Sequence, residues 1–301
     1  MKNTKPKVRL WSVLTGLTAI LTVAAIVGNI IANQYATTLN VALNASTYKI
    51  IKGETTGDTE YFKKGFASDE EREAYEAELC ATVEAEGAAL LKNENNALPL
   101  ASGAKVSLFG HGSVDLMYGG TGSGSVDTSK APNLKQALEA QGITINQTLW
   151  DLYSSDSMMS KYSRMTPASI SDTLEANTQY AVNEAPWSAL SSAESSFAEY
   201  GDAAIVVLSR SGGEGADLPS GENGTSDNWI SGQEGDGNYL ALSAEEIELL
   251  QNLKALKDNG TFKNIVVLIN SSNAIELDFL NPEICGEDYG IDAAMWIGDV
   301  G

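Results

Sequence analysis

Among the residues of this chain that could do acid–base chemistry, Glu214 has the most distinctive setting. It lies between Gly213 and Gly215, in the loop that follows the apolar run at 203–209, and this run predicts a buried strand. A carboxyl group at an exposed tip above a rigid strand can reach a partner on another module, as a proton-transferring carboxyl must. A solvated acid in a tight turn gives the same pattern, and these residues alone leave both interpretations open.

A second glycine-rich segment, residues 110–124, follows the short apolar run KVSLFG at 105–110. Its glycines allow backbone N–H groups to approach a ligand closely. The segment has neither the GxxxxGKS motif of a phosphate-binding loop nor the GxGxxG spacing of a dinucleotide site. A flexible surface loop is the other interpretation, and no nucleotide cofactor is expected.

Other kinds of catalytic site find little support. His111 is the single histidine, and the chain has no GxSxG motif. We therefore expect His111 to be a structural or exposed loop residue rather than the base of a Ser-His-acid hydrolase. Cys80 and Cys285 have no spacing for a zinc site, and we expect small buried side chains, with a single bridge as the alternative. The acidic stretch 217–239 lacks calcium-loop spacing, so no metal is expected.

The charge balance excludes one class of partner. The chain has 19 lysine and arginine residues against 40 aspartate and glutamate residues, which gives a formal net charge of -21. A nucleic acid would be repelled, and no basic cluster offers the contacts that release its counterions. We therefore expect no nucleic acid partner.

The N-terminal segment differs in composition from the rest. Residues 10–32 are mostly apolar and uncharged, and this run is long enough for a helix that crosses a bilayer. Basic residues precede this run, at Lys2, Lys5, Lys7 and Arg9. This asymmetry predicts a signal-anchor helix in the cell membrane, with 1–9 cytoplasmic, 33–67 an extracytoplasmic stalk, and the folded domain outside. A cleaved signal peptide is the alternative, although its apolar region usually has only about 7–15 residues.

The rest of the chain alternates between short apolar runs and helical patterns. The runs at 105–110, 203–209, 264–270 and 293–298 predict buried strands. Strand and helix in alternation predict an α/β fold, with a mostly parallel sheet and helices on both faces. In such sheets ligands bind beyond the carboxyl ends of the strands, where both glycine-rich segments are expected.

Two capping boxes predict where helices begin. Ser68 with Glu71, and Ser243 with Glu246, have the required spacing. We expect the first helix to continue to about Asn93. Its apolar side would consist of Leu79, Val83, Leu90 and Leu91.

Six segments together resemble one known domain. They are LLKNENNALPL (90–100), KVSLFG (105–110), GGTGSG (119–124), VVLSRSGGEGAD (206–217), LSAEEIELL (242–250) and NIVVLIN (264–270). In this order they resemble the α/β sandwich domain of family 3 glycoside hydrolases of the β-glucosidase type, over residues 68–301. The final AAMWIGDVG resembles a late strand of that domain, so the resemblance implies a domain that is incomplete at its C-terminus.

The resemblance implies a retaining mechanism with two carboxylates. It makes Glu214 the candidate acid/base, with Glu222 as a weaker alternative, and places the nucleophilic aspartate on a separate (β/α)8 barrel. It implies that Arg210 orients Glu214 or anchors its loop. It also implies a substrate-lining rim made of Gly119, Gly120, Thr121, Gly122, Ser123 and Gly124.

The resemblance implies a barrel that we expect to lie outside these 301 residues. A barrel needs about 250 residues, and only 67 precede the sandwich-like region. The chain therefore resembles the front part of a family member with reversed domain order, acting on short β-glucosides or oligosaccharides and inactive without its barrel. The alternative is a barrel-less, membrane-tethered carbohydrate-binding or structural protein.

Overall fold

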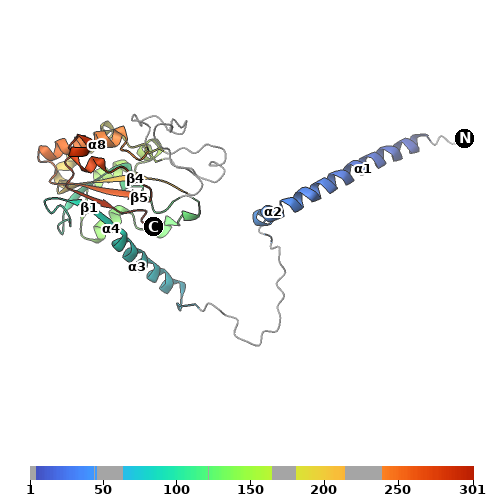
Figure 1. Cartoon of the computed structure of the whole chain (residues 1–301), viewed down its shortest axis with the longest axis horizontal. Helices are drawn as coiled ribbons and strands as arrows, with labels where there is room; N and C mark the ends of the chain where they lie inside the picture. Colours follow the sequence, from blue (N-terminus) through green and yellow to red (C-terminus); the bar gives the residue numbers. More distant parts are fainter. Residues whose placement is uncertain (1–4, 44, 46–63, 121, 165–180, 214–238) are drawn as a thin grey trace. The chain divides into compact units, whose positions relative to one another are not determined.

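A computed structural model describes residues 5–43, 45, 64–120, 122–164, 181–213 and 239–301 (Figure 1). The chain divides into two compact units, residues 1–65 and 66–301. Three of the predicted site residues, Thr121, Glu214 and Glu222, lie outside the described residues.

The first unit is helical. Its helices are α1 (Lys5–Gln34) and α2 (Ala36–Ala42). The part Leu10–Gln34 has a mean hydropathy of 2.1 and is long and apolar enough to cross a membrane, a test that a signal sequence also passes. Hydroxyl groups in this helix donate to the carbonyl four residues earlier, as Thr18 does to Leu14 at 2.9 Å, so they present no free donor to an apolar surrounding. Membrane anchoring stays a prediction.

The second unit is built on a six-stranded sheet with the strand order β1-β6-β5-β4-β2-β3. The strands are β1 (Ala89–Asn93), β2 (Lys105–Phe109), β3 (Thr144–Ile145), β4 (Ala203–Arg210), β5 (Ile265–Ser271) and β6 (Ala293–Trp296). The pairs β3–β2, β2–β4, β4–β5 and β5–β6 are parallel, and β1 pairs antiparallel with β6. The predicted mostly parallel sheet is confirmed.

Helices cover both faces of this sheet. They are α4 (Leu134–Ala140), α5 (Gln147–Tyr153), α6 (Asp156–Lys161), α8 (Ala244–Asp258) and α9 (Pro282–Cys285). The helix α3 (Asp69–Gly87) buries no residue and projects away from the sheet (Figure 1). Alternate residues of β4 enter two separate cores: Val206 packs with Leu249 of α8, and Ile205 packs in the cluster that Leu138 of α4 borders. Because both faces are covered, every residue of β4 is buried, which explains its continuous apolar run.

The first predicted helix is shorter than expected. Ser68 caps α3 by accepting a hydrogen bond from the Glu71 amide at 3.2 Å, as predicted, but the helix ends at Gly87. Leu90 and Leu91 belong to the edge strand β1, so the prediction of a helix to Asn93 was wrong. The backbone of this segment pairs with β6, a long-range contact that outweighs a helical spacing of leucines.

The two cysteines are also not where they were expected. Both are free: Cys80 is exposed and Cys285 is half-buried. Cys80 lies on α3, and no residue of that helix is buried. The expected buried positions and the alternative of a bridge were therefore both wrong.

Candidate active site

The carboxyl ends of β2, β4, β5 and β6 meet at one edge of the sheet, and the segments that follow them cross there. Gly110 begins the segment after β2 with φ +83°, in the left-handed region that glycine tolerates. A Cβ atom at Gly110 would lie 2.6 Å from the Val207 carbonyl oxygen of β4. The glycine therefore lets the chain leave β2 directly against β4.

Asn270, near the end of β5, holds this edge together. Its Nδ2 donates to the carbonyl oxygens of Met117 at 2.9 Å and Gly298 at 2.6 Å. Its Oδ1 accepts from the Met117 amide at 2.6 Å and from Ser209 Oγ at 3.2 Å. The side chain is fully buried, and all four hydrogen-bonding positions of the carboxamide are used. The segments after β2 and β6 are thereby fastened to the middle of the sheet.

Arg210 at the end of β4 is fully buried. Its guanidinium binds both carboxylate oxygens of Glu246 at 2.8 Å, one from each terminal nitrogen. The remaining N–H groups donate to the carbonyl oxygens of Ser209, Tyr239 and Ala241 at 3.0, 2.8 and 2.6 Å. All five donors of the guanidinium are occupied. Of the two roles predicted for Arg210, these contacts are those of an anchor, and they leave no donor for a ligand.

Glu246 links this anchor to α8. It occupies position N3 of the predicted capping box, three residues after Ser243. Its Oε2 accepts from the Ser243 amide at 2.8 Å, while Ser243 Oγ accepts from the Glu246 amide at 3.2 Å. The coulombic attraction and hydrogen bonds of Glu246 outweigh the effect of burial and raise the pKa of Arg210. The end of β4 is thus attached to the first turn of α8.

Tyr239 joins the two ends of the segment that carries Glu214. The Ser211 amide donates to Tyr239 Oη at 2.8 Å, and Tyr239 Oη donates to the Ser211 carbonyl oxygen at 3.1 Å. Together with the Arg210 contacts, these bonds hold residues 211–213 beside 239–241. The structure therefore gives the position of both ends of this segment.

The glycine-rich segment after β2 lies against one of these ends. A Cβ atom at Gly120 would be 3.2 Å from the Gly212 carbonyl oxygen and 3.8 Å from Gly213 Cα. Gly122–Gly124 form a short 3-10 turn, and a Cβ atom at Gly119 would lie 2.5 Å from the Gly124 carbonyl oxygen. Two segments that the sequence singled out separately, about ninety positions apart, are in contact at this edge.

A hollow of about 250 Å³ adjoins the glycine-rich segment. Asp115 and Arg164 line it together with Tyr118, Gly119 and Gly120. Asp115 Oδ2 lies 2.9 Å from Arg164 Nη2 and 3.3 Å from His111 Nε2. Burial pushes the pKa of Asp115 upward, but the hydrogen bond of His111 and the charge of Arg164 outweigh it, so this pKa lies below its ordinary value.

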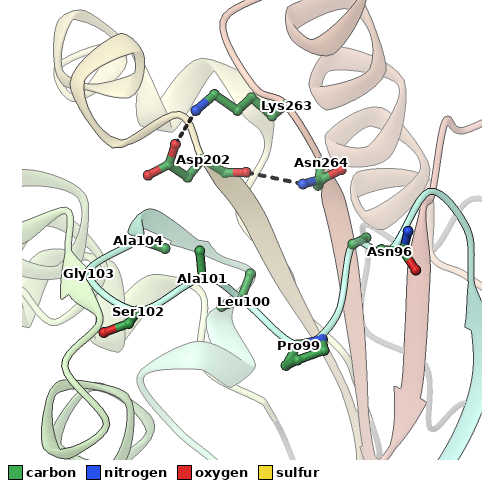
Figure 2. A pocket seen from close by; sticks show the side chains of 11 residues that line it. Asn96, Pro99, Leu100, Ala101, Ser102, Gly103, Ala104, Asp202, Lys263 and Asn264 are labelled. Atoms are coloured by element: carbon green, nitrogen blue, oxygen red, sulfur yellow. Dashed lines mark hydrogen bonds and ion pairs between the residues drawn. The ribbon is translucent and has the colours of Figure 1, made fainter.

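A second hollow, of about 350 Å³, lies at the amino edge of the sheet and contains none of the predicted site residues (Figure 2). Figure 2 shows the ion pair of Lys263 and Asp202 on one wall, at 2.5 Å, facing the segment from Asn96 to Ala104. Of these two hollows, the one beside the glycine-rich segment adjoins the candidate site.

Comparison with known proteins identifies the domain. Residues 88–298 match the family described as the glycosyl hydrolase family 3 C-terminal domain. The chain belongs to glycosyl hydrolase family 3. Over 146 residues it is 34% identical to Beta-glucosidase A of Butyrivibrio fibrisolvens. The matched region covers 46% of this chain and 15% of that protein.

Solved structures agree with this family 3 fold. A β-glucosidase from Paenibacillus barengoltzii superposes with a TM-score of 0.53 at 25% identity, over 74% of this chain and 21% of that one. β-Glucosidase 3B from Thermotoga neapolitana, in complex with glucose, superposes with a TM-score of 0.52 at 22% identity, over 76% of this chain and 28% of that one. The chain thus spans less than a third of the length of these relatives.

His111 and Glu184 form a buried pair beneath the site of the family 3 domain. Glu184 Oε2 accepts from the His111 amide at 2.6 Å, and Oε1 accepts from the Ala185 amide at 2.9 Å. Burial raises the pKa of Glu184 to about 7, although these hydrogen bonds oppose the rise. His111 is buried, which agrees with the structural role expected for it.

The sequence analysis missed four residues in or beneath this candidate site: Asn270, Asp115, Arg164 and Glu184. Asn270 was within a predicted strand but drew no attention, because a single polar residue in an apolar run indicates no particular partner. Asp115 and Arg164 are 49 positions apart, and the contact depends on how the loops fold. The signal that could have found Asn270 is its position at the carboxyl end of a buried strand, where ligand-facing loops begin.

Proposed function

We propose that this chain is the N-terminal part of a membrane-anchored family 3 β-glucosidase, and that it supplies the general acid/base Glu214. One observation carries the proposal: the contact between Gly120 and Gly212, which joins the glycine-rich segment to the stem just before Glu214. The family match and the similarity to a β-glucosidase over 146 residues support the same reaction class.

The proposed reaction has two steps and retains the anomeric configuration. In the first step, a barrel-borne aspartate attacks the anomeric carbon while Glu214 gives its proton to the departing glycosidic oxygen. In the second step, Glu214 takes a proton from water as that water displaces the enzyme carboxylate. The two carboxyl groups would be about 5–5.5 Å apart. A pKa of Glu214 near the working pH would serve both roles.

The nucleophile is proposed to lie on a (β/α)8 barrel of the same parent chain. The 301-residue chain alone is then expected to hydrolyse no glucoside at a useful rate. Adding the barrel would restore hydrolysis, because both carboxylates are needed.

We also propose that α1 anchors the protein in the cell membrane. Its basic N-terminal flank would stay in the cytoplasm, residues 33–67 would act as a stalk, and the family 3 domain would lie outside. Extraction of membranes with carbonate tests this. The intact chain should stay in the pellet, and its release would contradict a spanning helix.

The leaving-group dependence of the parent enzyme tests the role of Glu214. Glu214→Ala should slow the hydrolysis of an alkyl glucoside by about a hundredfold or more, because its leaving group needs the proton. A dinitrophenyl glucoside, whose leaving group needs no proton, should be slowed much less in the glycosylation step. Glu222→Ala is the matched control and should behave as the parent. Equal rates of Glu214→Ala and parent on both substrates would refute the assignment.

A further inference from the structure

Gly212 lies two residues before Glu214, and its surroundings leave no room for a side chain. A Cβ atom at Gly212 would lie closest to Asn273 Nδ2, with Asn273 Oδ1 at 2.5 Å and Cγ at 2.7 Å. The carboxamide of Asn273 therefore fills the space that a larger residue would need. The φ of Gly212 lies outside the left-handed region, so it is this contact, and not the backbone conformation, that requires glycine here.

Asn273 is itself held by the end of β5. Ser271 is the last residue of that strand and is fully buried. Its Oγ accepts from the Asn273 amide at 3.0 Å and donates to the Asn273 carbonyl oxygen at 3.0 Å. A single hydroxyl group thus holds both backbone polar groups of Asn273. The carboxamide that covers Gly212 is therefore attached to a fixed point of the sheet.

Gly212 and Asn273 each follow, by two residues, one member of a pair of strand residues. Arg210 of β4 lies opposite Ser271 of β5 in the parallel register. Arg210 is bound by Glu246 of α8 through both carboxylate oxygens. The two segments that leave this pair meet again where the Asn273 carboxamide lies against Gly212. The path of the chain from Arg210 to Gly212 is therefore set by both strands.

Other elements hold the neighbours of Gly212. Tyr239 Oη accepts from the Ser211 amide at 2.8 Å and donates to the Ser211 carbonyl oxygen at 3.1 Å. On the side of the glycine-rich segment, a Cβ atom at Gly120 would be 3.2 Å from the Gly212 carbonyl oxygen. Gly213 is the last described residue before Glu214. The contacts at positions 211 and 212 therefore define the direction from which the chain reaches it.

From these contacts we propose that Asn273 is a positioning residue for the acid/base Glu214. Its carboxamide fixes the direction in which the chain leaves Gly212, and this direction determines where the proton donor lies. The inference rests on the proposed function, because Asn273 acts on the reaction only through Glu214. A misplacement of about 1 Å, even by a change far from the chemistry, can slow a reaction about a hundredfold.

An exchange of sizes between the two positions tests the contact in the 301-residue chain. Gly212→Ala drives a methyl group into the carboxamide, whereas the same substitution in Asn273→Ala places it in the space that the carboxamide has left. Alone, Gly212→Ala should raise the unfolding equilibrium constant at least about tenfold, which corresponds to roughly 1.4 kcal/mol. In Asn273→Ala it should change this constant less than about threefold. An equal effect in both backgrounds, measured by urea denaturation, would overturn the contact.

The rates of the parent enzyme test the positioning role. The ratio kcat/KM reports on glycosylation, in which an alkyl leaving group needs the proton of Glu214 and a dinitrophenyl group does not. Gly212→Ala and Asn273→Ala should each lower kcat/KM for the alkyl glucoside about tenfold, and for the dinitrophenyl glucoside less than about threefold. The double variant should recover most of the alkyl rate that Gly212→Ala loses. Equal slowing of both substrates would indicate a merely structural role and would overturn the proposal.

Gly87→Ala and Asn252→Ala are the matched controls. No atom lies within 4 Å of a Cβ built at Gly87, at the end of α3. Asn252 is on α8 and donates to the Glu248 carbonyl oxygen of its own helix at 2.7 Å. Both variants should keep the parent's rates on both substrates. If these controls slow the alkyl glucoside as much as Gly212→Ala and Asn273→Ala do, the effect is not specific to this contact and the proposal fails.

Glu214→Ala separates this inference from the proposed function. If Glu214 is not the acid/base, Glu214→Ala leaves the alkyl glucoside at the parent's rate, and the proposed function is refuted together with the role of Asn273. If Glu214→Ala slows the alkyl glucoside selectively but Gly212→Ala and Asn273→Ala do not, the proposed function stands and Asn273 is not a positioning residue.

Discussion

The carboxamide of Asn270 pairs with the backbone of Met117 through two hydrogen bonds, donating to the carbonyl oxygen at 2.9 Å and accepting from the amide at 2.6 Å. A side chain of β5 thus pairs with the backbone of the segment after β2, at a residue where β5 is itself paired with β4. Through it, the segment that bears Asp115, Tyr118 and the glycine-rich turn rests on β5. The position of the candidate site therefore depends on a residue that touches no substrate.

Replacing Asn270 by aspartate should destabilise the domain. The substitution puts a carboxylate oxygen opposite the carbonyl oxygens of Met117 and Gly298, which lose their donor. Unmet buried polar groups cost about 1–3 kcal/mol each, and charged ones more. We expect the free energy of unfolding to fall by about 3 kcal/mol in urea denaturation. Asn252→Asp, on the outer side of α8, should change it by less than about 0.5 kcal/mol. A similar, small loss in both variants would argue against the role of Asn270.

The pair of Arg210 and Glu246 should show strong energetic coupling. Removing one partner of a buried ion pair leaves a charge without compensation and costs about 3–5 kcal/mol. Arg210→Met and Glu246→Leu should each lower the free energy of unfolding by that amount. The double variant should lose less than the sum of the two single losses, because no charge is then stranded. Additive losses in a double-mutant cycle would contradict the contact.

Glu184 should make the stability of the domain depend on pH. Its pKa is raised from an ordinary 4.5 to about 7 in the folded protein, so the unfolded chain loses this proton first as the pH rises. The free energy of unfolding should fall between about pH 4.5 and pH 7, by about 3 kcal/mol in total, and this penalty should be absent below that range. The measured quantity is the difference in the free energy of unfolding between the unmodified chain and Glu184→Gln, determined by denaturation at each pH. That difference should change with pH over this range, and a difference that stays constant would contradict the raised pKa of Glu184.

Two glycines with the same backbone conformation should differ in their tolerance of alanine. Gly110 and Gly103 have φ of +83° and +77°, so each substitution carries the cost of a left-handed residue, about 1–2 kcal/mol. Only at Gly110 would the new Cβ meet another atom, the Val207 carbonyl oxygen at 2.6 Å; at Gly103 nothing lies within 4 Å. Thermal unfolding should show a loss for Gly110→Ala that exceeds that of Gly103→Ala by at least about 1 kcal/mol. Equal losses would mean that β2 and β4 are not so closely apposed.

The central strands could be predicted from the sequence because burial on both faces leaves a plain signal. Every residue of β4 is buried, and its run AAIVVLSR is continuous apart from the polar end. The capping boxes also predicted helix starts correctly, since a side chain three residues away satisfies the free N–H groups locally. Features whose signal is contained in a run of about ten residues were thus accessible.

The edge strand and the contacts of the site were not accessible in this way. Leu90 and Leu91 fit a helical stripe as well as a strand, and what decides between them is pairing with β6, two hundred positions later. The pairing of Arg210 with Glu246, and of Asp115 with Arg164, depends on the same long-range folding. The sequence could indicate which loops meet at the sheet edge, but not which side chains meet there.

Chemical rescue of the parent enzyme carrying Glu214→Ala tests the central claim most directly. Azide needs no general base, so it should attack the glycosyl-enzyme in place of water, forming a C–N bond as the bond to the nucleophilic carboxylate breaks. With a dinitrophenyl β-glucoside, turnover should rise with azide concentration, and NMR should identify the product as β-glucosyl azide. No acceleration and no glycosyl azide in Glu214→Ala, with rescue in Glu222→Ala instead, would show that a different residue is the acid/base.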